Sequence, residues 1–205
     1  MRVRTLGAAV AAVLALTGLA GCKTNVGQAA VIDGHRVTES DVNHYLTPDA
    51  QPVVQTDPNT QATTRVSPRS FVVSWLINAQ LYRKVMSLIP SVSNVSEAQL
   101  DSQLQKDLAG QTVTQFAESH GLHGFTEAFY TVVLHTQEAI VVLQTARSNG
   151  VDVAAAFNKL KFSVTVSPRY GSWDNKQFLF TAGGHLPSYL DVLNGGTQQG
   201  LTGNS

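Results

Sequence analysis

Two histidines and a glutamate share one short polar segment, "ESHGLHG" at residues 118–124, and these side chains are the best candidates for a metal site. His120 and His123 stand three residues apart, and Glu118 precedes them. Imidazole and carboxylate groups bind zinc, but a zinc site needs three or four ligands in a tetrahedral arrangement. No residue at a suitable spacing supplies the others, so we interpret both histidines as polar loop residues. The sequence predicts neither a metal nor a cofactor.

Catalytic signatures do not emerge from the rest of the sequence. It contains no Gly-x-Ser-x-Gly elbow, no phosphate-binding loop and no His-Glu-x-x-His pair. The other histidines are scattered along the chain, at His35, His44, His135 and His185. We therefore predict that the protein is not an enzyme, and an isomerase or a hydrolase remains the less favoured alternative.

The first 21 residues have the pattern of an export signal. Arg2 and Arg4 give a positive start, and residues 6–19 form an unbroken run of apolar and small residues. This run is shorter than the approximately 20 residues that a membrane-spanning helix needs, and it suits the hydrophobic part of a secretory signal. We expect residues 1–21 to be a signal peptide.

Cys22 is the only cysteine of the chain, so no intrachain disulfide can form. It follows "LAG" directly, and this ending resembles the bacterial lipobox, in which cleavage precedes the cysteine and its sulfur receives a diacylglycerol. The resemblance implies lipidation of Cys22 and a cell-membrane location on the extracytoplasmic face; a plain signal peptide is the alternative. Residues 22–28 would then be a short tether, reaching about 20–25 Å when extended.

The charge balance argues against two classes of partner. Loss of residues 1–21 removes Arg2 and Arg4 and leaves 12 Lys and Arg against 14 Asp and Glu. No block of basic residues remains, which disfavours nucleic-acid binding and a polybasic membrane patch.

The periodicity of apolar residues predicts a mainly helical domain over residues 29–175. N-cap residues, prolines and glycines delimit the helices, which we expect at residues 39–46, 68–89, 96–108, 112–119, 126–148 and 153–160. Residues 47–67 contain three prolines and no apolar period, and we expect an exposed loop there. Residues 176–205 are rich in Gly and Gln, and we expect a disordered tail.

Two β signals stand at opposite ends of this domain. Residues 31–37 read as a hairpin around an Asp-Gly turn, and residues 162–166 alternate between apolar and polar side chains. A strand must satisfy its backbone groups with a partner, so we predict that the two segments pair in one small sheet. We expect the rings of Tyr170 and Trp173 to fold back over this sheet.

The opening "AAVIDGHRVTESDVNHYL" and the closing "VTVSPRYGSWD", with helices between them, resemble the N-terminal chaperone domain of SurA- and PrsA-type envelope foldases. The ending is similar to that of actinobacterial lipoproteins of this kind, and the likeness covers about residues 29–175. The resemblance implies a SurA-like fold that joins both ends of the domain in a sheet. Because about 30 residues follow Asp174, we expect no parvulin isomerase domain of about 90 residues.

This resemblance implies a chaperone-like protein that binds unfolded or exported polypeptides without catalysis. An adaptor or assembly factor for one dedicated partner is the alternative. Four aromatic residues are candidates for an apolar peptide groove or for the core, and we favour the core: Trp75, Tyr82, Phe129 and Tyr130. The sequence specifies neither the peptide-binding residues nor the oligomeric state.

Overall fold

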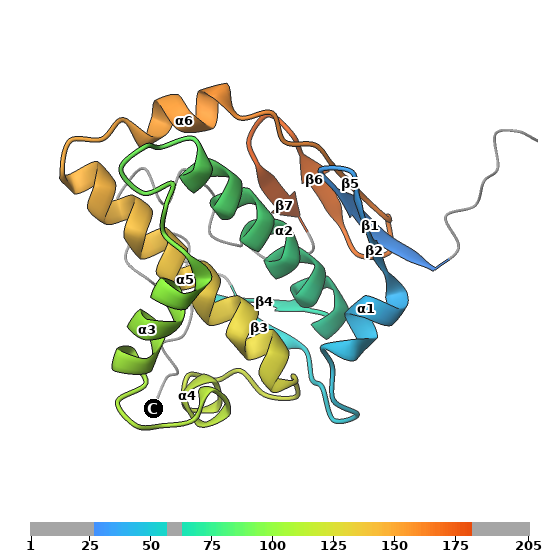
Figure 1. The fold of residues 1–205 in the computed structure, drawn as a ribbon. Coiled ribbons are helices and arrows are strands. Elements are labelled where there is room, and N and C mark those ends of the chain that lie inside the picture. The colour runs from blue at the N-terminus through green and yellow to red at the C-terminus, as the bar shows by residue number, and fades with distance from the viewer. Residues whose placement is uncertain (1–26, 57–62, 182–205) are drawn as a thin grey trace, which may run out of the picture.

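The computed structural model describes residues 27–56 and 63–181, which form six helices and three small antiparallel sheets (Figure 1). Helices α2 (Pro68–Ser87) and α5 (Glu127–Ser148) lie side by side at the centre of the molecule. The sheets flank α2, whereas α3 and α4 lie on the other side of α5. The mainly helical class predicted from the sequence is confirmed. The predicted signal peptide, Cys22 and residues 23–26 lie outside the described residues.

The largest sheet joins the two ends of the domain, as predicted. Its central strand is β1 (Gln28–Ile32), which pairs with β2 (His35–Thr38) on one side and with β5 (Val164–Val166) on the other. Both pairings are antiparallel. Strand β1 begins one residue before the predicted domain boundary at residue 29, and Gln28 is already buried.

A two-residue turn sets the register of β1 against β2. Asp33 has a φ of 50° and Gly34 a φ of 87°. Two consecutive positive φ values are the requirement of a type I′ turn, whose twist matches that of the flanking strands. Aspartate tolerates this region and glycine has no side chain to oppose it, so the Asp-Gly pair favours this hairpin locally.

Side-chain caps begin most of the helices at the residues predicted. Reciprocal capping boxes join Thr38 with Asp41, Ser96 with Gln99 and Thr112 with Gln115, and single caps are made by Ser67 and Asp152. Ser67 caps α2. In chain order, the other four caps begin α1 (Glu39–His44), α3 (Glu97–Asp107), α4 (Val113–Ser119) and α6 (Val153–Lys159). Thr126 is the N-cap residue of α5, with extended backbone as an N-cap requires, but its side chain makes no capping hydrogen bond. The Thr126 Oγ1 is buried instead, without a partner among the described residues.

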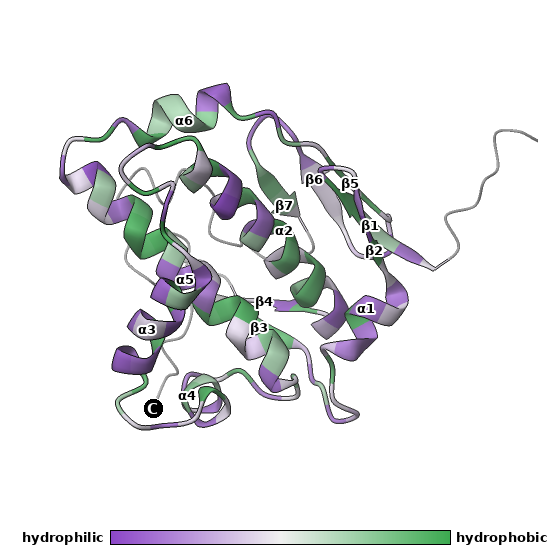
Figure 2. Ribbon diagram, viewed as in Figure 1, coloured by the Kyte–Doolittle hydropathy of each residue, from purple (hydrophilic) through white to green (hydrophobic). Residues whose placement is uncertain are grey.

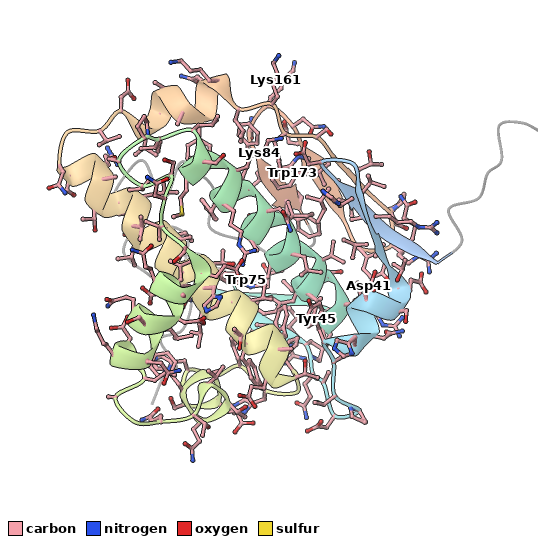
Figure 3. The ribbon with its side chains drawn as sticks, in the orientation of Figure 1. Asp41, Tyr45, Trp75, Lys84, Lys161 and Trp173 are labelled. Carbon is pink, nitrogen blue, oxygen red and sulfur yellow. The ribbon has the colours of Figure 1, made fainter. Side chains whose placement is uncertain are left out.

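Aromatic rings fill the space between α2 and α5. Phe71 of α2 packs against Phe129 of α5 and against Phe125, with ring centroids 5.9 and 5.5 Å apart. Trp75 and Tyr45 extend this cluster through Phe71 and Phe129 respectively. Figure 2 shows apolar residues on both of these helices, and Figure 3 places Trp75 between them. The central helices therefore share one continuous core.

The predicted loop at residues 47–67 is wrong for residues 53–56 and 63–66. Strands β3 (Val53–Thr56) and β4 (Thr63–Val66) form an antiparallel hairpin, and Val66 is 1% exposed. Both strands are rich in β-branched residues, which favour extended backbone. Val66 is buried in the core, and its partner Val53 is partly buried against it. A strand with so few buried positions has no clear apolar alternation, and this is why the sequence pattern missed it.

The first half of the same segment docks against the start of α5. Leu46 forms an isolated antiparallel bridge with Phe125, and the Thr47 N–H donates to the carbonyl of Gly124 over 3.1 Å. A Cβ added to Gly124 would lie 2.4 Å from the Cα of Ala50. Glycine at this position therefore permits the close approach of two backbones.

The chain after β5 forms a further hairpin, which corrects the predicted domain end at residue 175. Strand β6 (Ser172–Asp174) pairs with β7 (Leu179–Thr181), and Phe180 opposite Trp173 is 2% exposed. Asp174 begins the turn by accepting the backbone N–H groups of Lys176 and Gln177. Polar residues at 175–177, between the two strands, obscure this hairpin in the sequence, where the prediction is a disordered tail from residue 176. Residues 182–205, the rest of that predicted tail, lie outside the described residues.

Several contacts attach the closing segment to the helices. Lys84 of α2 pairs with Asp33 in the β1–β2 turn and lies 5.9 Å from the centroid of the Phe162 ring. Trp173 packs against the same ring, and Figure 3 shows Lys84 and Trp173 on the sheet side of α2. Tyr170 is 3% exposed. Both aromatic residues of the closing motif thus contribute to packing at this end of the domain.

Within residues 27–56 and 63–181, no helix combines the length and the apolar character needed to cross a membrane.

The close approach at Gly124 predicts the effect of a methyl group there. Gly124→Ala should lower the free energy of unfolding by about 2–4 kcal/mol, because it adds a backbone clash to the cost of a positive φ. Urea unfolding followed by circular dichroism measures this change.

Gly121→Ala is the matched control. Gly121 has nearly the same φ, +83° against +82°, but a Cβ there would meet nothing within 4 Å. This variant should lose only about 1–2 kcal/mol. Equal losses in the two variants would show that the contact between Ala50 and Gly124 is not tight.

Candidate functional site

A groove of about 1120 Å³ lies between α5 and the segment that carries α3 and α4. One face of α5 provides about half of its lining, and the loops after α2 and α5 close its end. The lining residues are Ser91, Val92, Gln103, Leu104, Asp107, Phe116, Leu134, Gln137, Glu138, Val141, Val142, Gln144, Thr145, Ala146, Asn149 and Val151.

The length of the groove follows from the helix that forms its floor. The lining residues of α5 run from Leu134 to Ala146, mostly at the three- and four-residue spacing of one helix face, and the C-cap Asn149 continues this row. Fifteen residue steps along a helix cover about 22 Å. An extended polypeptide advances about 3.3 Å per residue, so about six or seven residues would lie along this face.

The lining combines an apolar floor with polar groups. Leu104, Leu134 and Ala146 are buried, whereas Val141 and Phe116 are partly exposed. Amide, hydroxyl and carboxyl groups alternate with these side chains. Sites for organic ligands commonly combine an apolar surface with a few polar groups in this way, because the apolar part supplies affinity and the polar part fixes orientation.

Two carboxyl groups meet in this groove. Glu138 of α5 is only 8% exposed, and the carboxyl group of Asp107 at the end of α3 lies beside it in the same lining. Asp107 also accepts a hydrogen bond of 3.2 Å from the Nε2 of Gln103. Proximity of the two carboxyl groups favours a proton on one of them, because two carboxylates repel each other and cannot share a hydrogen bond.

Burial raises the pKa of Glu138 from 4.5 to about 7, and the hydrogen bond to Asp107 and the repulsion by its charge act in the same direction. A buried carboxyl group loses the hydration that stabilises its charged form, and a neighbouring negative charge disfavours ionisation further. Near neutral pH, Glu138 thus exists in protonated and ionised forms.

A second polar contact joins the same two helices. His135 of α5 is 8% exposed, and its Nε2 lies 2.7 Å from the Oδ1 of Asp101 in α3. Asp101 is largely exposed to solvent. Neither residue lines the groove, so this pair positions α3 on α5 beside the two carboxyl groups.

The candidate metal ligands lie at the C-terminal end of α4. The Nδ1–H of His120 donates to the carbonyl of Phe116 over 2.7 Å, and the two rings pack 4.3 Å apart. His123 and Glu118 are exposed. The part of the chain that the structure describes holds no group of three or more His, Cys, Asp or Glu residues suited to a metal ion.

The four aromatic candidates lie in the core and not in the groove. Trp75, Tyr82, Phe129 and Tyr130 are each at most 4% exposed, and none of them lines the groove. The hydroxyl of Tyr130 donates to the carbonyl of Leu122, which ties the polar end of this ring to the loop before α5. The preference for a core role of these residues is confirmed.

The sequence reasoning missed both carboxyl groups of the groove. Glu138 stands in "TQEAIVVL", where an acidic residue interrupts an otherwise apolar part of α5. An acidic residue within an apolar helical stretch is expected to be buried, and a buried acid is rare without a partner. The position of Glu138 in this stretch was the signal that the sequence offered. Asp107 carries no comparable signal, because it lies in the polar last turn of α3.

Comparison with known proteins adds no relative. A scan against protein-family models, a search of curated proteins and a search of solved structures each returned no match.

The shifted pKa of Glu138 predicts a change in stability with pH. Between about pH 4.5 and 7 the native state retains a proton that Glu138 releases on unfolding, so this group makes the native state less stable as pH rises through that window. Glu138→Gln removes the titration. Relative to the unchanged protein, the variant should gain about 1–3 kcal/mol between pH 5 and pH 8.

Urea unfolding at both pH values measures this difference, and Glu118→Gln is the control because it makes the same substitution at an exposed site. The control should show no such gain. If the two variants respond alike to pH, the raised pKa of Glu138 is refuted.

Proposed function

We propose that the protein is a lipid-anchored component of the cell envelope that binds unfolded or extended polypeptides in the α3–α5 groove, without catalysis. The groove itself is the observation that carries this proposal. Its floor offers apolar surface over about 22 Å, and its polar side chains alternate with that surface. A polypeptide in extended conformation presents the same combination, since apolar side chains alternate with backbone amide groups.

The weak selectivity expected of such a binder follows from the lining. Valine, leucine and alanine contacts depend on buried apolar area and not on the identity of the ligand side chain. Side-chain amides such as those of Gln103 and Gln137 can both donate and accept hydrogen bonds. The groove therefore suits many apolar segments, which is the requirement of a holdase.

The topology supports the SurA-like part of the proposal. The resemblance implies a domain whose opening strand pairs with a closing strand that follows the helices. Here β1 pairs with β5, and Ala30 lies opposite Val166. All six helices of the described residues fall between these two strands in the sequence.

The proposed anchor would hold the domain near the bilayer. If Cys22 carries the lipid, only residues 23–27 separate it from β1, which begins at Gln28. Five extended residues span about 18 Å. The domain would thus bind polypeptides close to the membrane surface and not at the end of a long stalk.

A substitution on the groove floor tests polypeptide binding. Val141 lines the groove and is partly exposed, so Val141→Gln removes apolar surface while keeping a good helix former. The affinity of the purified full chain for a reduced, carboxymethylated protein should fall about threefold to tenfold, which corresponds to about 0.7–1.4 kcal/mol. Fluorescence anisotropy with labelled ligand measures it.

Val132→Gln is the matched control, because Val132 lies partly exposed on the same helix but outside the groove. It should bind like the unchanged protein. No binding of several unrelated unfolded proteins by the unchanged chain would contradict the holdase function and favour the adaptor for one dedicated partner.

Lipid anchoring is tested separately at the single cysteine. Cys22→Ser removes the only thiol that could be acylated, so the expressed protein should move from the detergent-rich to the aqueous phase in Triton X-114 partitioning. Intact mass of the unchanged protein should show the diacylglycerol. Equal partitioning of both forms would refute the anchor and leave the groove proposal untouched.

A further inference from the structure

We propose that the groove selects polypeptide segments in which one lysine or arginine stands between apolar residues, and that Asp107 and Glu138 together bind this cation. The inference rests on the proposed function and adds the chemistry of the bound segment.

The charges of the groove have one sign. Asp107 and Glu138 are the only titratable residues among its described lining. The other charged or titratable residues of α3, α4 and α5 do not line it: Glu97, Asp101, Lys106, Glu118, Glu127, His135 and Arg147. A ligand that enters the groove thus meets two acidic groups on an apolar surface and no basic lining group to neutralise them.

Among the residues that the structure describes, the groove lining supplies no cation for the buried Glu138. Its side chain is more than nine-tenths buried, and the group that it contacts is another carboxyl. A buried acid normally has a basic partner or several hydrogen-bond donors, because removal of its charge from water is costly. Apolar residues of the groove flank Glu138 on the same face of α5, including Val141 and Leu134.

An ammonium or guanidinium group between the two carboxyl groups would offset the repulsion between their charges and the cost of burying them. Glu138 would release its proton to solvent, and both carboxylates would then face the cation. The apolar stem of lysine or arginine would lie on the groove floor, as these stems do elsewhere on apolar surfaces. The chain's own residues 182–205 contain no lysine or arginine, so they are a poorer match for this site than a basic polypeptide segment.

Two matched peptides test the charge. Each has seven residues, with leucine and valine flanking either a central lysine or a central norleucine, which keeps the stem but lacks the ammonium group. At pH 8 the purified full chain should bind the lysine peptide at least about fivefold more tightly. Glu138→Gln and Asp107→Asn should each reduce this ratio toward 1, and the exposed control Glu118→Gln should preserve it.

The pH dependence of the two peptide affinities provides a second readout. A purely structural role of Asp107 and Glu138 would leave the ratio of these affinities unchanged with pH. At pH 5.5 Glu138 is protonated, so the ratio of the two affinities should fall several-fold. Near pH 7, isothermal titration in buffers of different ionisation enthalpy should show that the lysine peptide releases about half a proton on binding. The norleucine peptide should release none.

The outcomes separate the two proposals. If both peptides bind equally at pH 8, or if the ratio survives in both carboxyl variants, the cation site is refuted while polypeptide binding stands. If neither peptide nor an unfolded protein binds, the proposed function itself fails, and the cation site with it. A synthetic peptide of residues 182–205 provides a competitor. If it displaces the lysine peptide and binds more tightly than the norleucine peptide does, the groove belongs to that segment and the inference is overturned.

Discussion

The packing of α5 against α2 is the contact on which the rest of the structure depends. Phe71, Phe125 and Phe129 pack against one another between the two helices, and Tyr45 extends this cluster. Because α5 is apolar around much of its circumference, its remaining faces need cover as well. Helices α3 and α4 cover them in part, and the groove is the part that they leave open. The candidate site is thus a consequence of how one central helix is shielded.

Local signals in the sequence predicted most helix boundaries, because caps act over three or four residues. Ser96 with Gln99 and Thr112 with Gln115 form the reciprocal bonds that their spacing suggests. The two hairpins β3–β4 and β6–β7 were missed for the opposite reason. Their strands are short and bury few side chains, so contacts with distant elements stabilise them. A pattern within the strand cannot report such contacts.

The candidate site was much less accessible to prediction than the fold. Asp107 and Glu138 are 31 positions apart, and only the docking of α3 on α5 brings their carboxyl groups together. The pair of His135 and Asp101 that supports this docking is 34 positions apart. Known catalytic and metal-binding motifs have fixed spacings in the sequence, whereas a carboxyl pair formed across two helices has none. The burial that gives Glu138 its unusual pKa is likewise a tertiary property.

The pairing of β1 with β5 also determines when the domain can finish folding. Ala30 and Val166 face each other across 136 positions, so one edge of β1 has no partner until nearly all of the domain has been synthesised. Until then, buried residues such as Ile32 lack part of their final packing. Contacts of such long sequence separation close slowly and expose apolar surface in the meantime. A chain cut short before β5 could form its helices but could not complete this sheet.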